Sequence, residues 1–191
     1  MKKTKKILLA GLVFAMVLAM TACGKNSTPS ESVESELKAV QNESISDLEK
    51  TMPNTMDSSY SDDWKSFLKK IQKFDYKIKD EKIKGNKATV TVTIKTYDFG
   101  NAYQETYNQI VQDAQSGTIT SSTDVTKYVY DLMFKNLLAV DKKTYSKDVV
   151  INCKKNDKGE WETDVQSNEQ FLNAIMGGLE DKIAEMSSAQ S

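Results

Sequence analysis

Residues 74–96, FDYKIKDEKIKGNKATVTVTIKT, carry the strongest structural signal in the chain. Apolar and polar residues alternate with a period of two on both sides of the pair Gly85-Asn86, as in half-buried strands. A Gly-Asn pair between two such runs favours a two-residue hairpin turn. Ile83 falls on the opposite parity from Ile78, which predicts a bulge between them. The predicted inward face of the second strand consists of Ala88, Val90, Val92 and Ile94.

A second hairpin is predicted towards the C-terminus. Residues 149–153 alternate between apolar and polar, residues 156–159 have turn composition, and residues 161–165 alternate again on the return strand. Apolar residues at helical spacing surround the two hairpins. They predict helices over about 29–40, 45–52 and 61–71, then 101–115 and 123–138, and a final helix that opens at Ser167 and runs to about 185.

Three details of these helices can be checked against a structure. Thr28 and Glu31 have the spacing of a capping box, and Ser167 with Gln170 repeats that spacing before the final helix. The pair Gly177-Gly178 inside the final helix indicates close packing or a kink. One side of the helix over 101–115 is apolar. That side carries Tyr103, Tyr107, Ile110, Val111 and Ala114.

The composition of the chain disfavours several kinds of function. Its 191 residues include no His and no Arg, so the commonest zinc ligand and the bidentate anion-binding fork are both missing. We therefore expect no metal site and no cofactor. Lysines and acidic residues are interspersed along the sequence without a basic stripe, so nucleic acid is not an expected partner.

The first 23 residues have the pattern of an export signal. Four lysines among the first six residues precede an apolar run from Ile7 to Met20, which is shorter than the roughly 20 residues of a membrane-spanning helix. The following residues, Thr21-Ala22-Cys23, complete a segment that resembles the signal peptide of bacterial lipoproteins, whose cysteine is acylated and becomes the first residue. Two other interpretations are an uncleaved membrane anchor and an ordinary secretory signal in which Cys23 has no role.

These boundaries predict one folded domain. Residues 1–22 form the signal peptide, residues 23–28 a lipidated tether, residues 29–186 a single α+β domain, and residues 187–191 a disordered tail. Removal of the signal leaves 22 Lys against 27 acidic residues, a net charge of −5. With Cys23 acylated, Cys153 has no partner for an internal disulfide, so the stability of the domain must come from its core.

The start of the predicted domain has a familiar pattern. The segment 29–40, PSESVESELKAV, followed by Asp47-Leu48, resembles the opening of small bacterial lipoproteins of the NTF2-like, cystatin-like superfamily. The segments 74–76 and 159–161 are similar in style to later parts of that family. The resemblance implies N-terminal helices packed on a curved antiparallel sheet around a cone-shaped cavity, here with an added C-terminal helix. Some members of the superfamily are enzymes and others only bind, so fold alone does not choose between these functions.

Aromatic residues are the candidate ligand-binding groups. Tyr97, Tyr103, Tyr107 and Trp161 could offer ring faces and polar edges to an amphipathic ligand. Tyr128 and Tyr130 could extend such a groove. The alternative is that these rings are part of the core and show only their hydroxyl groups at the surface. Cys153 lies on an apolar strand face, which favours a buried thiol over a redox or metal role.

An enzymatic alternative rests on Asp98. A tyrosine beside a desolvated carboxylic acid can stabilise an oxyanion, so Asp98 with Tyr97 or another tyrosine could serve a cavity enzyme of the isomerase or dehydratase type. The competing interpretation is an acidic turn between a strand and a helix. The sequence as a whole favours a non-catalytic module that is held on the extracytoplasmic face of the membrane by acylated Cys23. Its ligand would be a small molecule, a peptide or an envelope protein.

Overall fold

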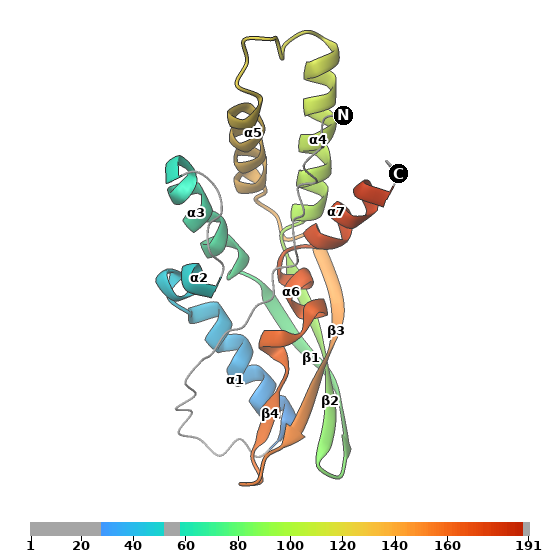
Figure 1. Cartoon of the computed structure of the whole chain (residues 1–191). Helices are drawn as coiled ribbons and strands as arrows, with labels where there is room; N and C mark the ends of the chain where they lie inside the picture. Colours follow the sequence, from blue (N-terminus) through green and yellow to red (C-terminus); the bar gives the residue numbers. More distant parts are fainter. Residues whose placement is uncertain (1–27, 52–57, 189–191) are drawn as a thin grey trace, which may run out of the picture.

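A computed structural model describes residues 28–51 and 58–188 of the chain. Within them, helices pack on a four-stranded antiparallel sheet with the strand order β1-β2-β3-β4, which confirms the α+β class (Figure 1). The strands are β1 (Asp75–Lys84), β2 (Lys87–Thr96), β3 (Tyr145–Lys155) and β4 (Trp161–Thr163). The predicted signal peptide and Cys23 lie outside the described residues.

Helices precede, separate and follow the two hairpins in the expected order. They are α1 (Pro29–Asn42), α2 (Ile45–Thr51), α3 (Ser61–Ile71), α4 (Phe99–Gln115), α5 (Val125–Ala139), α6 (Glu169–Ile175) and α7 (Leu179–Ser188), with short 3-10 helices η1 (Ser58–Tyr60) and η2 (Val165–Ser167). The capping box of α1 is confirmed. The amide of Glu31 donates to Thr28 Oγ1 at 3.2 Å, and the amide of Thr28 donates to Glu31 Oε2 at 3.1 Å.

The first hairpin matches its prediction closely. Lys84 pairs with Lys87 across the two-residue turn, and Gly85 has a φ of +60°, as the first central residue of a type II′ turn requires. The pairing register shifts between Ile78 and Asp80, which confirms the bulge. Strand β3 pairs along the whole of β2 on its other side.

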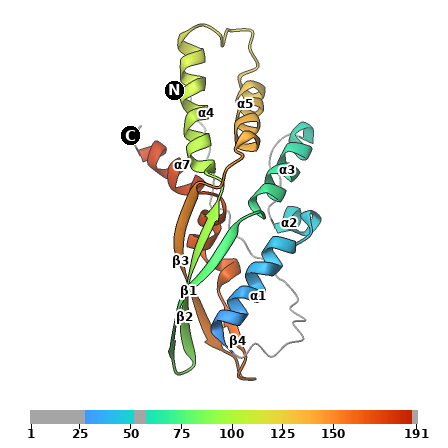
Figure 2. The same ribbon diagram turned by 180° about the vertical axis from the view of Figure 1, so that it is seen from behind.

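The core lies on one face of the sheet. Helices α1 and α6 cover this face, while the described part of the chain places no helix over the other (Figures 1 and 2). Val33 and Leu37 of α1 are fully buried against the inward residues of the sheet. These sheet residues are also fully buried: Val90, Val92, Ile94, Val149 and Ile151. Apolar side chains therefore fill the space where the NTF2-like resemblance implies a cavity, and each contributes about 1.5–3 kcal/mol of burial.

The return strand of the second hairpin is shorter than predicted. Strand β4 ends at Thr163, and Val165 belongs to η2 rather than to the strand, although its side chain is fully buried. The reason is that Asp164 takes over the pairing. Its amide donates to the carbonyl of Asn152 at 3.0 Å, and its carboxylate accepts from the amide of Asn152 at 2.9 Å.

The single final helix is a wrong prediction, since α6 and α7 are separate. Gly177 and Gly178 have φ angles of +59° and +72°, which a continuous helix does not allow. The capping box at Ser167 is also wrong. Asn168 is the N-cap of α6, because its Oδ1 accepts a hydrogen bond from the amide of Phe171 at 3.0 Å.

Helix α7 extends two residues past the predicted end of the domain at residue 186. Ser187 and Ser188 still belong to α7, where their hydroxyl groups donate to the carbonyls of Ile183 and Glu185 at 2.8 Å. Both hydroxyl groups thus bond to carbonyls of the preceding turn of the helix. The final residues, 189–191, lie outside the described part of the chain.

Candidate functional site

Helices α4 and α5 form a helical hairpin, residues 99–139, that projects beyond the end of the sheet (Figures 1 and 2). Each helix starts on an aspartate. Asp98 accepts from the amide of Asn101 at 2.9 Å, and Asp124 accepts from the amide of Lys127 at 3.1 Å. A carboxylate at the N-cap satisfies a free amide and faces the positive end of the helix dipole. The hairpin is therefore encoded locally at both helix starts.

The apolar side of α4 is not buried along its length. Tyr107 is 37% exposed and Val111 is 36% exposed, and Ala114 is exposed as well. The buried residues of α4 all lie in its first half, where α7 packs against it. Its second half extends past the sheet, where α5 is the neighbouring helix (Figure 1). The apolar side of α4 thus continues beyond the sheet, where no other element of the described chain fully covers it.

Polar contacts join the two helices of the hairpin. Tyr128 donates to Asp113 Oδ2 at 2.5 Å, and Asn136 donates to Thr106 Oγ1 at 2.9 Å. The hydrogen bond to Asp113 raises the pKa of Tyr128, because it favours the protonated phenol. The other side of α5 packs on aromatic rings. Tyr60 lies 5.2 Å from Tyr130 and 5.9 Å from Phe134, measured between ring centroids.

Tyr97 lies at the base of the hairpin, where β2 passes into α4. The Lys70 ammonium stands 4.9 Å from the centroid of the Tyr97 ring and donates to the carbonyl of Leu138 at 2.6 Å. Burial lowers the pKa of Lys70. These groups line a shallow pocket of about 430 Å³ whose rim includes Lys73 and Asp141. The ammonium already has a carbonyl and a ring as partners, so its main role here is to hold α3 against the end of α5.

The four predicted ligand-binding aromatics do not meet in one place. Tyr97 directly follows the pair Thr96–Tyr145 at one end of the sheet, whereas Trp161 pairs with Lys155 at the other end. About ten strand residues separate these two ends, or roughly 30 Å. Trp161 is 8% exposed and lies under the Lys155 ammonium, 5.0 Å from the ring centroid. Tyr103 and Tyr107 belong to α4, so the aromatics are spread over the length of the domain.

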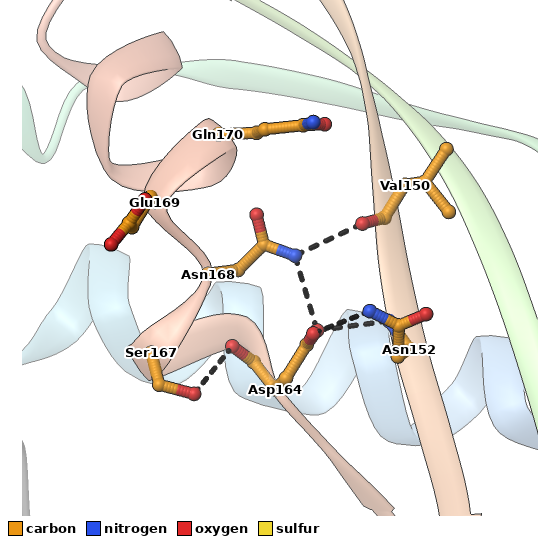
Figure 3. Close-up of a pocket in the computed structure, with 7 residues that line it drawn as sticks. All are labelled: Val150, Asn152, Asp164, Ser167, Asn168, Glu169 and Gln170. Carbon is orange, nitrogen blue, oxygen red and sulfur yellow. Dashed lines mark hydrogen bonds between the residues drawn. The ribbon is translucent and has the colours of Figure 1, made fainter.

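A second pocket, of about 320 Å³, lies where η2 and α6 meet the free edge of β3. Figure 3 shows hydrogen bonds among most of its polar groups, but none from the side chains of Glu169 and Gln170 to the other residues drawn. Asn168 Nδ2 donates to the carbonyl of Val150 at 2.9 Å and to Asp164 at 3.2 Å, and Asn152 Nδ2 donates to Asp164 at 2.7 Å. These contacts continue the sheet pairing past the end of β4 and cover an open strand edge. Asp164, Asn152 and Asn168 therefore stabilise the edge of the sheet. The sequence alone did not indicate this role.

Asp98, the carboxylate of the enzymatic alternative, is a partly exposed helix N-cap and lines neither of these two pockets. Cys153 is buried, as expected, and desolvation raises the pKa of its thiol to about 12. Among the described residues, no group of three or more metal-ligating side chains gathers in one place. None of the described helices combines the length and apolar character needed to span a bilayer.

No protein-family model and no curated protein matches the chain. Among solved structures, the chain is similar to ycdA of Bacillus subtilis, a protein described as a candidate lipoprotein, with 16% sequence identity and a TM-score of 0.43. The similarity covers 87% of this chain and 52% of ycdA, so this chain spans about half the length of that protein. A likeness at this TM-score establishes neither a shared fold nor a shared function.

Proposed function

We propose that the protein is a lipid-anchored extracytoplasmic lipoprotein whose folded domain is a non-catalytic module that binds another envelope protein. The anchor is acylated Cys23, and its support is the sequence pattern of residues 1–23. An NTF2-like kinship is part of the proposal, and its support is the order of helices and hairpins together with the segment 29–40.

The observation that carries the binding role is the contrast between a filled core and a partly uncovered helical hairpin. A small ligand needs a concave site, but the sheet face under α1 is occupied by fully buried side chains such as Leu37 and Val92. Tyr107 and Val111 instead display apolar surface on a projecting helix. Tyrosines are enriched at protein interfaces, because a ring and a hydroxyl serve both dry and wet contacts.

The charges of the helical hairpin indicate which kind of protein surface it would bind. The segment 96–126 contains no lysine in a chain whose cationic side chains are all lysine. It holds four acidic residues: Asp98, Glu105, Asp113 and Asp124. The whole helical hairpin, residues 99–139, leaves out Asp98 and adds Asp131, Lys127 and Lys135, so its net charge is −2. A protein surface rich in Lys or Arg would complement this anionic end of the domain.

Site-specific photocrosslinking in intact cells tests this role. A photoreactive phenylalanine analogue replaces Tyr107, and the matched control carries it at Thr91, which lies on the uncovered sheet face. The proposal expects one discrete protein adduct from position 107 and none from position 91. Equal adducts from both positions, or none from position 107 in a correctly localised protein, would overturn the binding role of the hairpin.

The anchor has its own test. Cys23→Ser removes the sulfur that would carry the lipid, so the variant should leave the membrane fraction and lose the mass of the acyl chains. A Cys23→Ser protein that fractionates with membranes at the processed mass of the parent would disprove the lipoprotein assignment. This readout does not involve Tyr107. The lipid anchor and the binding role of the helical hairpin can therefore be disproved independently of each other.

A further inference from the structure

Three lysines stand side by side at the end of the sheet opposite the helical hairpin. Lys84 pairs with Lys87 across the β1–β2 turn, and Lys87 pairs with Lys154 of β3. On β4 the row ends at Glu162, which pairs with Lys154 and accepts a hydrogen bond from Asn156 at 3.1 Å. Cross-strand neighbours have Cβ atoms about 4.5–5.5 Å apart, so the three ammonium groups repel one another. All three side chains are exposed, and within the described ranges no carboxylate lies within 4.0 Å of their Nζ atoms. We call this row, with Ile83, the lysine tip.

An apolar residue accompanies these charges. Ile83 lies next to Lys84 on β1 and is 55% exposed, more than the other large apolar side chains of the described residues. Ala88, its partner on β2, is buried. Ile83 therefore shares the sheet face of Ala88, and the lysines point to the other face, since successive strand residues alternate between faces. Three neighbouring lysines and an exposed aliphatic side chain at the same end of the sheet have the chemistry of a surface that contacts anionic lipid headgroups and the boundary beneath them.

The chain enters the domain at this same end. The amide of Ser30 donates to Glu81 Oε2 at 2.7 Å, which attaches the start of α1 to β1. Glu81 lies only three residues before Lys84 on that strand. The other end of α1 is held near the start of β1, where Gln41 Nε2 donates to the carbonyl of Phe74 at 2.7 Å. Helix α1 thus runs from the lysine tip towards the base of the helical hairpin (Figures 1 and 2).

Chain length brings the lysine tip close to the proposed anchor. Five peptide units separate Cys23 from Thr28, and they span at most about 18 Å even when fully extended. A lipid on Cys23 therefore keeps the start of α1 within that distance of the bilayer. The tip of the helical hairpin lies about 60 Å away along β2 and α4.

We infer that the lysine tip is a membrane-facing surface that binds anionic phospholipid headgroups and orients the helical hairpin away from the bilayer. This inference depends on the proposed acylation of Cys23. Each lysine near an anionic bilayer strengthens association by roughly fivefold, so three lysines favour this orientation by on the order of 100-fold. The lipid holds the protein at the membrane, and the lysine tip determines which end faces it.

Energy transfer from the protein to the bilayer surface tests the orientation. The acylated protein is reconstituted in vesicles of phosphatidylcholine with 30% phosphatidylglycerol, and in vesicles of phosphatidylcholine alone, with an acceptor dye on the headgroups. Single donor dyes are attached through Asn86→Cys at the turn beside the lysine tip or Thr118→Cys at the far end of the helical hairpin. Cys153 is 4% exposed and its thiol has a pKa raised to about 12, so it should not react with the dye.

The expected result is strong transfer from position 86 and weak transfer from position 118 in the anionic vesicles. The triple variant Lys84→Gln, Lys87→Gln, Lys154→Gln should lower transfer from position 86 to the level in neutral vesicles, as should high salt. A matched triple variant at three other exposed lysines has the same change in net charge and should keep the parent values. Its positions are Lys69→Gln, Lys73→Gln and Lys142→Gln.

Three outcomes would overturn the inference. They are equal transfer from both positions, no difference between the two triple variants, and salt-sensitive association of the lysine tip with the acidic hairpin of a second copy of the chain. Slow labelling of Cys153 in every variant shows that the sheet is folded. If acylation itself fails, both dyes stay off the vesicles and the mass of the protein lacks the lipid, so failure of the anchor is distinct from failure of the orientation.

Discussion

The sheet half of the domain and the helical hairpin are held together by different interactions. In the sheet half, Val90, Val92 and Ile94 are fully buried, so apolar burial supplies the free energy of folding. The hairpin joins the same core through Phe99, Phe134 and Leu137. Elsewhere in the hairpin, side-chain hydrogen bonds such as the one from Tyr128 to Asp113 join the helices while part of the apolar side stays exposed. The difference teaches that stability is concentrated at one end, which leaves the other end free to present a surface.

The largest effect is expected at Gly177, where the two halves meet. A Cβ atom there would stand 2.0 Å from the carbonyl oxygen of Tyr97, and the φ of +59° already disfavours any side chain. The carbonyl of Gly177 also accepts the amide of Gly100 at 3.1 Å. Gly177→Ala must push the β2–α4 junction away from the α6–α7 junction, so we expect a loss of at least about 4 kcal/mol of unfolding free energy in urea denaturation.

Gly117 provides the matched control for this change. It also has a positive φ, +78°, but it follows α4 at the tip of the hairpin and a Cβ there would meet nothing within 4 Å. Gly117→Ala should therefore cost only the backbone penalty of about 1 kcal/mol. Equal losses for the two alanine variants would show that backbone strain, rather than the contact between the two halves, determines the effect.

The second prediction compares a core side chain with a hairpin side chain. Leu37 is fully buried under the sheet, so Leu37→Ala should lower the unfolding free energy by about 2–5 kcal/mol. Val111 is 36% exposed, so Val111→Ala should change it by at most about 0.5 kcal/mol. Calorimetric melting of both variants checks this ratio. A Val111→Ala loss as large as that of Leu37→Ala would mean that the hairpin is part of the stabilising core.

The sequence predicts the sheet half better than the hairpin, because its signals there are local. The alternation in 74–96 specifies which side chains point inward, and Gly85-Asn86 specifies the turn and the pairing of Lys84 with Lys87. Both follow from residues within one hairpin. Lys154 joins that pair only through the pairing of β2 with β3, which no short segment of sequence specifies. The lysine tip could therefore not be predicted from the distribution of lysines along the sequence.

Two features that the sequence did not determine have a common physical cause. An amphipathic pattern shows which side of α4 is apolar, but not whether another element covers that side, so the sequence left open whether Tyr107 binds a ligand or belongs to the core. The Gly177-Gly178 pair signalled close packing, yet the atom that leaves no room for a side chain at Gly177 is the carbonyl oxygen of Tyr97, 80 residues earlier in the sequence. In both cases the deciding partner is distant along the chain, where periodicity and turn chemistry carry no information.

The smallest predicted effect concerns a buried charge in the sheet half. Glu36 is 7% exposed, and burial raises the pKa of its carboxyl above the ordinary value, although a hydrogen bond with Thr163 opposes the shift. A raised pKa in the folded state favours the protonated form, so stability from this group is complete below about pH 4 and is lost as the pH rises through the folded-state pKa.

Glu36→Gln removes that loss and should raise the melting temperature at pH 7, with the gain disappearing at pH 4. Glu34, a half-exposed residue on α1 that pairs with Lys38 at 2.7 Å, is the control, since Glu34→Gln should give no such gain at pH 7. A melting temperature of Glu36→Gln below that of the parent at pH 7 would show that the contact with Thr163 outweighs the cost of burying the charge.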